Sequence, residues 1–427
     1  MTAFTYRDGV LHAEAVSLAA LADALGTPLY VYSFDELARR YRAYADAFPD
    51  ALLCYAYKAN ASLAVCAWLR ALGAGADVVS GGELRVAQAA GVPGPRTIFN
   101  GNGKSDPELQ AAIAGDVLSI NIDAVEEIER VAAVAARLGR RAPVSIRVNP
   151  GVDPHTHRHI STGVASSQFG VALAEVEAAA ARVAATPSLE LVGLHSHIGS
   201  QISELEPLVA AVDVIADLAR HVQARGLPLR LLDIGGGLGI DYHRWDSVTA
   251  KDAPVLTPAD LARAILPRVA DLGLQLALEP GRSIIAPAGV LLGQVLHVKH
   301  GADSDRVVLD TGMNALIRPS LYEAYHAILP VATAPLALSA AVVGPNCESA
   351  DVVGRGRALP ALRSGDRVAV MDAGAYGYAL ASNYNSRPRP AEVAVQGDRW
   401  RVIRPAETWE GLLSGQTVPD WSPPQSV

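Results

Sequence analysis

The sequence predicts an α/β fold: a (β/α)8 barrel of the TIM type, joined to a second, antiparallel β-rich domain. From about residue 50 to about residue 280, short apolar runs alternate with longer Ala/Leu-rich amphipathic runs. This alternation is typical of parallel strands joined by crossover helices, and about eight units in roughly 250 residues match a closed barrel. After about residue 285 the helical periodicity largely fades, and the chain of 427 residues is long enough for two domains.

The elements of the barrel follow from these runs. The apolar, often β-branched runs expected as strands are Leu52–Tyr57, Ala76–Val79, Thr97–Asn100, Val117–Asn121, Val144–Val148, Leu191–His195, Leu229–Ile234 and Leu274–Glu279. Helices are expected between them, for example at Ala61–Leu72, Asp123–Leu138, Leu173–Ala184 and Leu205–Ala224. A doubly wound open sheet is the alternative, but it would usually have fewer strands in this length.

Both ends of the chain are expected in the second domain. Asp8-Gly9 between two short alternating segments predicts a hairpin, and a short helix and the run Pro28–Tyr32 follow it. Further strands are expected at Val290–Val298, Arg306–Leu309, Leu336–Val343, Arg367–Met371 and Glu392–Val402. We therefore expect the barrel at residues 35–283 and a β-rich domain built from residues 1–34 and 284–427.

The composition narrows the classes of function. A net charge of −8 argues against a nucleic-acid partner, which would require a basic face. No apolar run reaches the roughly 18 residues of a membrane span, and the first residues do not resemble a signal peptide. The three cysteines, Cys54, Cys66 and Cys347, form no CxxC pair. A reducing, cytoplasmic location is therefore expected.

Most of the predicted strands end in side chains that can do chemistry. These are Lys58, Asp77, Ser80, Asn100, Asn121, Arg147, Asn149, His195, His197, Asp233 and Glu279. In a barrel the carboxyl ends of all strands meet on one face, where barrels of this type hold their active sites. Polar residues also follow strands simply because loops are polar. That reading explains poorly a lysine, two histidines and a glutamate attached directly to apolar runs.

Lys58 ends the first barrel strand, in the segment YAYKAN. A lysine in an apolar run is costly unless it is neutral or bonded to another group. Schiff-base chemistry uses such a desolvated amine, with its pKa shifted toward the neutral form. The alternative is a surface lysine just beyond the end of a strand. The sequence contains three other lysines, Lys104, Lys251 and Lys299, which lie in polar loops or on an alternating strand.

Two further segments suit an anionic, nitrogen-containing ligand. In DIGGGLG, Gly235, Gly236 and Gly237 would let backbone N–H groups approach a phosphate, although a plain tight turn is the alternative. In EPGRS, Glu279 could hold a proton on a pyridine nitrogen. Arg282 in the same segment, beside Gly281, could bind phosphate or carboxylate, and a surface Glu–Arg pair is the alternative.

Two other segments leave their roles open. His195 and His197 point the same way on a strand and could bind metal, but no third ligand is obvious. Stacking of an imidazole on a cofactor ring is an equally good use, so no metal is predicted. Cys347, in a polar turn, is a candidate proton donor or nucleophile, although a lone cysteine is more often inert.

Taken together, the motifs resemble the fold type III pyridoxal-phosphate decarboxylases, most closely the branch that acts on diaminopimelate. The segments YAYKAN, DVVSGGEL, HSHIGSQI, DIGGGLGI, EPGRS, GPNCES and DAGAYGYALASNYNSRPRP occur in the family's order along essentially the whole chain. Any one motif alone would be modest evidence, whereas the ordered set is highly specific.

The resemblance implies a role for each matching residue. Lys58 would bind pyridoxal 5'-phosphate covalently, His197 would stack on its ring, and Glu279 would pair with the pyridine nitrogen. The rest of the cofactor shell would be Ser200, Gly235, Gly236, Gly237, Gly281, Arg282 and Tyr376. The substrate would be bound by Arg282, Arg318, Tyr322, Glu348 and Tyr376. Cys347 as proton donor and Glu348 would reach into the active site of the other subunit of a homodimer.

The implied reaction is decarboxylation of meso-2,6-diaminopimelate to L-lysine and carbon dioxide, the last step of lysine biosynthesis. A related decarboxylase acting on ornithine, arginine or a carboxylated polyamine is the alternative, but such enzymes use acidic groups to bind a distal cation. A racemase would place an arginine rather than Glu279 at the pyridine nitrogen, and a non-catalytic relative would lack part of the cofactor site. One departure is Gln168, where the family more often carries lysine, and it bears on substrate preference rather than on the reaction.

Overall fold

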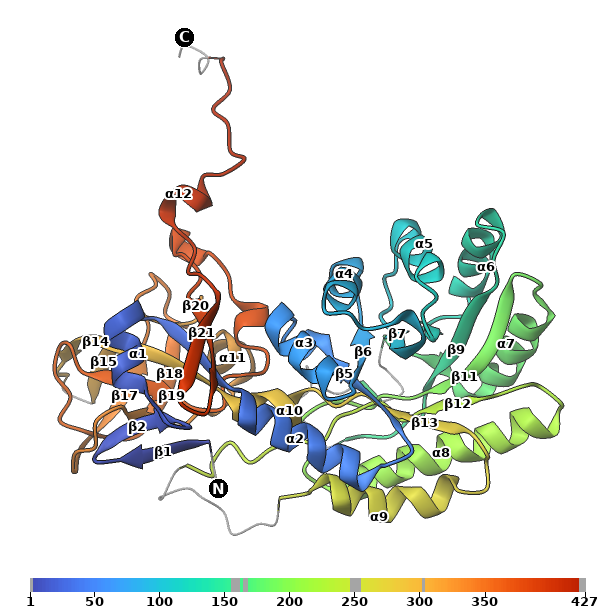
Figure 1. Cartoon of the computed structure of the whole chain (residues 1–427), viewed down its shortest axis with the longest axis horizontal. Helices are drawn as coiled ribbons and strands as arrows, with labels where there is room; N and C mark the ends of the chain where they lie inside the picture. Colours follow the sequence, from blue (N-terminus) through green and yellow to red (C-terminus); the bar gives the residue numbers. More distant parts are fainter. Residues whose placement is uncertain (1–2, 155–161, 164–167, 246–254, 302–303, 422–427) are drawn as a thin grey trace.

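The computed structural model describes residues 3–154, 162–163, 168–245, 255–301 and 304–421 as two domains that lie side by side (Figure 1). One is a ring of parallel strands with helices around it, and the other is dominated by β-structure. None of the helices among these residues is both long enough and apolar enough to span a membrane.

The first domain is a closed barrel of parallel strands. Its strands are β5 (Leu52–Ala56), β6 (Gly75–Val78), β7 (Thr97–Phe99), β8 (Ser119–Ile122), β9 (Ala142–Asn149), β11 (Leu189–His195), β12 (Leu231–Asp233) and β13 (Gln275–Leu278). Each pairs with the next, and β13 pairs with β5 to close the ring. The short strand β10 (Val171–Ala172) continues the pairing beside the end of β9.

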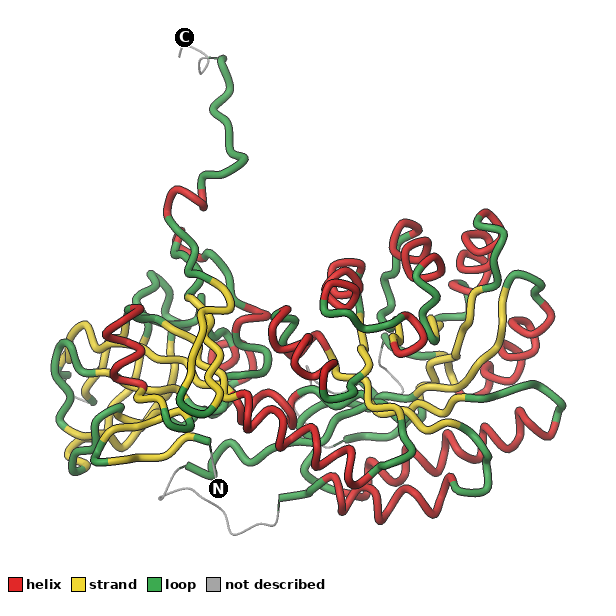
Figure 2. The backbone as a smooth tube through the Cα atoms, in the orientation of Figure 1, coloured by secondary structure: helices red, strands yellow, loops and turns green. Residues whose placement is uncertain are grey.

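Helices surround the barrel and cover the apolar strands (Figure 2). They are α2 (Phe34–Ala47), α3 (Leu63–Ala71), α4 (Gly81–Ala89), α5 (Asp106–Ala114), α6 (Glu127–Arg137), α7 (Leu173–Ala185), α8 (Leu205–Ala224) and α9 (Pro258–Val269). The inward stripe of α8 shows why such runs form helices here, since Leu208, Val212, Ile215 and Val222 recur at helical spacing and are all buried.

The second domain contains a mixed sheet that joins both ends of the chain. Its strands are β4 (Leu29–Ser33), β14 (Gly289–Lys299), β15 (Asp305–Leu309), β16 (Ile328–Pro330), β17 (Leu336–Val343), β18 (Val352–Pro360), β19 (Arg367–Val370), β20 (Ala391–Gln396) and β21 (Arg399–Arg404). Strand β4 lies between β14 and β20. A smaller sheet of β1 (Phe4–Arg7), β2 (Val10–Ala13) and β3 (Val16–Ser17) precedes helix α1 (Leu18–Leu25).

The two domains are bonded where the carboxyl end of β5 meets the second domain. The Asn60 side chain donates to the carbonyl oxygen of Gly374 at 3.1 Å, and the Tyr376 N–H donates to the carbonyl oxygen of Ala59 at 2.8 Å. The segment after Met371 therefore lies against the carboxyl ends of the barrel strands. The short helices α10 (Arg282–Ile285) and α11 (Arg318–Tyr322) contribute to the same region.

The predicted fold class is confirmed, with one difference in the second domain. Its sheet is mixed rather than antiparallel, because β15 pairs with β17 and β20 pairs with β4 in parallel. Several elements also differ from the predictions, and two of them bear on the bounds of predicted runs. Glu392–Val402 is a hairpin of β20 and β21 rather than one strand, and α6 begins at Glu127 rather than at Asp123. The division at residues 35–283 is kept as our proposal for the domain boundaries.

Candidate active site

A cavity of about 450 Å³ opens at the carboxyl ends of the barrel strands, where the second domain meets the barrel. Its lining includes many of the predicted site residues. They are Lys58, His197, Ser200, Glu279, Arg282, Arg318, Tyr322 and Tyr376. Residues from six barrel strand ends and from the second domain thus converge on one space, as the (β/α)8 architecture requires.

Lys58 follows β5 in a single 3-10 turn, Tyr57–Ala59, and its side chain faces the cavity. Its Nζ lies 3.6 Å from Oδ2 of Asp77, which is fully buried at the end of β6. Burial opposes the charge on Lys58, but Asp77, Tyr376 and Glu279 outweigh it, so the pKa of this amine is raised. The prediction that the pKa of Lys58 is lowered toward the neutral amine is therefore wrong for the protein without its cofactor. The reason is the carboxylate of Asp77, which lies close to the amine.

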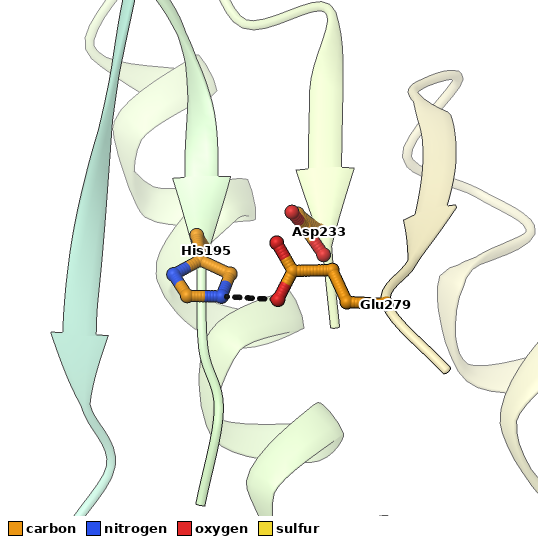
Figure 3. Close-up of side chains that lie close together, drawn as sticks. All are labelled: His195, Asp233 and Glu279. Atoms are coloured by element: carbon orange, nitrogen blue, oxygen red, sulfur yellow. Dashed lines mark ion pairs between the residues drawn. The ribbon is translucent and has the colours of Figure 1, made fainter. Parts of the chain in front are cut away.

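Glu279 lies at the centre of a buried polar cluster (Figure 3). Its Oε2 is 3.3 Å from Nε2 of His195, and its Oε1 accepts a hydrogen bond from Nδ2 of Asn100 at 2.5 Å. Burial opposes ionisation, but His195 and Lys58 hold the pKa of Glu279 well below its usual value. Burial and the charge of Glu279 raise the pKa of Asp233 well above its usual value. One ionised carboxylate is thus presented at the base of the cavity.

This cluster also has the composition of a metal site. One ligand atom from each of His195, Asp233 and Glu279 lies within 4.8 Å of the others, and all three residues are buried. A protonated Asp233 would be a weak metal ligand, since metals bind the ionised carboxylate. With Asp233 protonated and Glu279 ionised, the cluster suits a ligand that donates a hydrogen bond to the carboxylate of Glu279.

The glycine run packs too closely for side chains. A Cβ on Gly236 would lie 2.2 Å from the carbonyl oxygen of Glu279, and Gly237 has a φ of +110°. The Gly235 N–H donates to Oδ1 of Asp233 at 2.9 Å, and the Gly236 N–H donates to Nδ1 of His197 at 3.2 Å. Of the three glycine N–H groups, only that of Gly237 has no acceptor among the described residues. The run therefore anchors His197. The glycines predicted for the cofactor shell, which are Gly235, Gly236, Gly237 and Gly281, are not among the described residues that line the cavity. Two of them, Gly235 and Gly236, line a separate pocket beside α8.

His197 is held as a neutral ring. Because Nδ1 accepts the hydrogen bond from Gly236, the proton of the neutral imidazole belongs on Nε2. Burial is the largest cause that lowers the pKa of His197 well below its usual value, and Lys58 and Arg147 add to this effect. A neutral, flat ring at the cavity wall is suited to stacking on an aromatic ligand.

Two buried arginines line the cavity without a carboxylate partner among the described residues. Arg282 donates from Nε to Oγ of Ser200 at 3.1 Å and lies over the ring of Tyr376 at 4.8 Å. Arg318 lies over the ring of Tyr242, also at 4.8 Å, and its buried Nε has no hydrogen-bond acceptor in the described part of the chain. A buried charge is costly unless it is paired, so this end of the cavity is built for anionic ligands.

Cys347 and Glu348 do not line the cavity of their own chain. They lie in an exposed turn between β17 and β18, where the Cys347 N–H donates to Oδ1 of Asn385 at 2.7 Å. Gln168 lines a neighbouring cavity instead of this one, although the adjacent Phe169 does reach the site.

Other lining residues had no assigned role in the sequence predictions. Asn100 and Arg147 carried the signal that could have found them, because both end barrel strands. The rest, for which the sequence offered no such signal, are Val79, Gly101, Asn102, Gly103, Thr162 and Phe169.

The chain is similar to known proteins along most of its length. Residues 34–286 match the sequence profile of a family described as "Pyridoxal-dependent decarboxylase, pyridoxal binding domain". A protein from Pseudomonas aeruginosa named diaminopimelate decarboxylase is 44% identical over 98% of this chain and 99% of that protein. Diaminopimelate decarboxylase from M. jannaschii, solved in complex with L-lysine, is 36% identical, with a TM-score of 0.92 over 97% of this chain and 98% of that chain.

A second solved structure agrees with these matches. Diaminopimelate decarboxylase from Helicobacter pylori, complexed with L-lysine, has a TM-score of 0.88 and 39% identity, and covers 92% of this chain and 98% of that chain. These similarities indicate the same family as the fold and as the lysine and glutamate at the carboxyl ends of the strands. The chain belongs to the pyridoxal-dependent decarboxylase family, in the branch whose curated members are named diaminopimelate decarboxylase.

Proposed function

We propose that this protein decarboxylates meso-2,6-diaminopimelate to L-lysine and carbon dioxide, with pyridoxal 5'-phosphate as its cofactor. The observation that carries the proposal is the content of one cavity: Lys58, an ionised and buried Glu279, and two arginines that have no carboxylate partner in the described part of the chain. The names of the relatives support the choice of substrate.

The two arginines suit a cavity that binds two anionic groups, one from the cofactor and one from the substrate. Arg282 lies with Ser200 beside the glycine run, and is assigned to the cofactor phosphate. Arg318 comes from the second domain, and is assigned with Tyr322 to the carboxylate that the substrate retains. A guanidinium can bind a carboxylate through two parallel hydrogen bonds. This assignment favours diaminopimelate over ornithine or a polyamine, whose distal group is cationic.

The cofactor fits the residues that line the cavity. The glycine run does not itself line the cavity, but Gly237 packs against Gly199, which precedes the lining residue Ser200. The Gly237 N–H would then be available to a phosphate held by Ser200 and Arg282. Bound pyridoxal phosphate would supply an electron sink for the electron pair that remains when carbon dioxide leaves. Glu279, whose pKa is held low, would hold a proton on the ring nitrogen.

The remaining residues bind, orient and move protons. The amine of Lys58 would hold the cofactor covalently and yield that position to the amine of the substrate, while Asp77 keeps Nζ near the cavity. His197 would support one face of the cofactor ring, and Tyr376 would contribute to the cofactor and substrate shell. The packing of the second domain against the barrel would limit the access of water to the reacting carbon.

A homodimer completes the proposed site. Cys347 is one of three free thiols and is exposed, whereas Cys54 and Cys66 are buried. Cys347 would serve as proton donor, and Glu348 would bind the distal amine of the substrate, both in the active site of the other subunit. The dimer interface would lie on the β-rich domain. Free thiols support the proposed cytoplasmic location.

Lys58→Ala tests the proposal. We expect turnover of meso-diaminopimelate to fall more than about 10³-fold, because the amine that binds the cofactor is gone. The visible absorbance of the bound cofactor should be lost as well. Lys299→Ala is the matched control, since Lys299 lies exposed on β14.

The wild-type protein should release carbon dioxide and L-lysine from meso-diaminopimelate and much less carbon dioxide from ornithine, arginine or a carboxylated polyamine. Near-normal turnover by Lys58→Ala would contradict the proposed role of this lysine. Wild-type turnover that favours ornithine would contradict the proposed substrate.

A further inference from the structure

His326 lies outside the cavity lining and outside every motif discussed above, yet it contacts Arg318 directly. It is fully buried between α11 and β16. Nη1 of Arg318 lies 2.8 Å from Nε2 of His326, and Nδ1 of His326 lies 2.8 Å from the carbonyl oxygen of Met371. Both ring nitrogens are therefore engaged.

The chemistry of the two partners fixes the protonation of the ring. A carbonyl oxygen can only accept, so Nδ1 of His326 carries the hydrogen that it donates to Met371. A guanidinium can only donate, so Nε2 accepts from Arg318 and carries no hydrogen. The ring is a neutral acceptor for Arg318, and burial lowers the pKa of His326 well below its usual value.

Backbone hydrogen bonds fix the position of Met371, whose carbonyl oxygen accepts from the His326 ring. The Met371 N–H donates to the carbonyl oxygen of Ala327 at 2.8 Å, so the residue after His326 is paired with the same residue that accepts from its ring. Helix α11 ends at Tyr322 and is capped by Glu323, whose φ of 52° is left-handed. The chain then turns back so that His326 reaches Arg318. The ring therefore has little freedom to move.

The same contacts link the two arginines. The His326 ring meets the Tyr242 ring edge to face at 5.2 Å, and Arg318 lies over the other ring of this pair. Nη1 of Arg282 donates to the Tyr242 hydroxyl at 2.9 Å. Tyr242 thus packs under one arginine and accepts from the other. The Nε of Arg318 has no acceptor among the described residues and stays available for a ligand.

We propose that His326 is a positioning residue that orients the guanidinium of Arg318 toward the retained carboxylate of the substrate. The proposal rests on the proposed function, since it takes Arg318 as the carboxylate-binding group. His326 does not touch the substrate, and it acts by occupying one donor of Arg318 and leaving the others directed to the cavity.

Two variants separate the bonds of the ring. His326→Asn can keep a donor near the position of Nδ1, and loses the acceptor for Arg318. His326→Gln can place an amide oxygen near the position of Nε2, and so keeps that acceptor. His297→Asn, at an exposed position on β14, is the control. Each variant is studied as the holoenzyme.

We expect His326→Asn to raise the KM for meso-diaminopimelate at least about 10-fold, with a smaller change in kcat, because a hydrogen bond to a charged group is lost. His326→Gln should recover much of that loss. Inhibition by L-lysine, which has a carboxylate, should weaken in parallel with KM. Inhibition by 1,5-diaminopentane, which has none, should change less than about 2-fold.

The outcomes are distinguishable. Equal weakening of inhibition by L-lysine and by 1,5-diaminopentane would show a general packing role and overturn the proposal. An unchanged KM in a folded His326→Asn variant would do the same. If the wild-type protein itself fails to decarboxylate meso-diaminopimelate, the proposed function is wrong. The positioning role is then wrong as well, and the wild-type assay distinguishes this outcome from a failure seen only in the variants.

Discussion

At the scale of single residues, three buried carboxylates around the base of the cavity carry different protonation states. Glu279 is held ionised by His195 and Lys58, and Asp233 is held protonated by burial and by the charge of Glu279. Burial raises the pKa of Asp77 to about 7, with Glu279 adding to the shift and Lys58 opposing it. Because these three carboxylates are buried near one another, ionising all of them together would be costly.

Asp77 gives the cofactor-free protein a stability that depends on pH. Because its folded pKa is raised above the ordinary value of 3.8, its contribution is full below that value and is lost as the pH rises through about 7. Asp77→Asn removes this titration. Between about pH 5 and about pH 8, we expect the variant to gain at least about 1 kcal/mol relative to the wild type.

Thermal unfolding followed by calorimetry at both pH values would measure this gain. Asp46→Asn, on the exposed side of α2, is the control and should follow the wild type. A constant difference between wild type and Asp77→Asn across the pH range would show that Asp77 does not titrate as described.

The sequence predicted some site residues well and others not at all. Lys58, His197 and Glu279 follow apolar strands, and the closure of a barrel brings such positions together whatever the loops do. His326 and Tyr242 follow no such rule. They reach Arg318 because the chain reverses after Glu323 and because the loop after the glycine run folds toward the second domain. Neither of these turns is predicted by a periodic pattern in the sequence.

At the scale of elements, the barrel was more predictable than the second domain. The eight predicted strand runs each overlap a barrel strand, because a strand buried on both faces is apolar throughout. Strand β18 was missed, since Gly354, Arg355, Gly356 and Arg357 interrupt any apolar pattern. It is a strand because it pairs with β17 along its length, which is a tertiary effect.

The β20–β21 hairpin was missed for a different reason. Gly397, with a φ of +61°, and Asp398 form a tight connection between two runs in which apolar and polar residues alternate. A Gly-Asp pair between two alternating runs is a known hairpin signal. The alternation on both sides of Gly397 and Asp398 suits a single strand equally well.

The hairpin also holds an ion pair that can be tested, between a buried carboxylate and an exposed arginine. Glu392 on β20 is fully buried, accepts from the Tyr32 hydroxyl at 2.8 Å and pairs with Arg404 of β21 at 2.5 Å. Arg404→Ala leaves this carboxylate short of one partner, and we expect a loss of roughly 1–3 kcal/mol of stability.

Arg399→Ala on the same strand, where the side chain is exposed, should change stability by less than about 0.5 kcal/mol. Calorimetric midpoints of the two variants check the comparison. If both variants lose the same stability, the pair with Glu392 contributes little, as exposed ion pairs often do.

At the scale of the whole molecule, the proposed homodimer makes each active site depend on two chains. Lys58→Ala removes one half of a site, and Cys347→Ala removes the half that would come from the other subunit. When the two inactive variants are mixed and allowed to exchange subunits, about a quarter of the wild-type activity should return, since half of the dimers then contain one intact site.

Each variant carried through the same exchange alone is the control and should stay inactive. Decarboxylase assays with size-exclusion chromatography would follow the recovery. If no activity returns although mixed dimers form, Cys347 and Lys58 act within the same site of one chain.

The position of β4 between β14 and β20 has a consequence for synthesis on the ribosome. Tyr32 bonds to Glu392, 360 residues later, so this apolar strand leaves the exit tunnel long before its neighbours exist. At about 5–20 residues per second, the wait is roughly 20 to 70 seconds. Stalled nascent chains that end before residue 391 should therefore be cut by protease near Leu29–Ser33, and released full-length chains should resist.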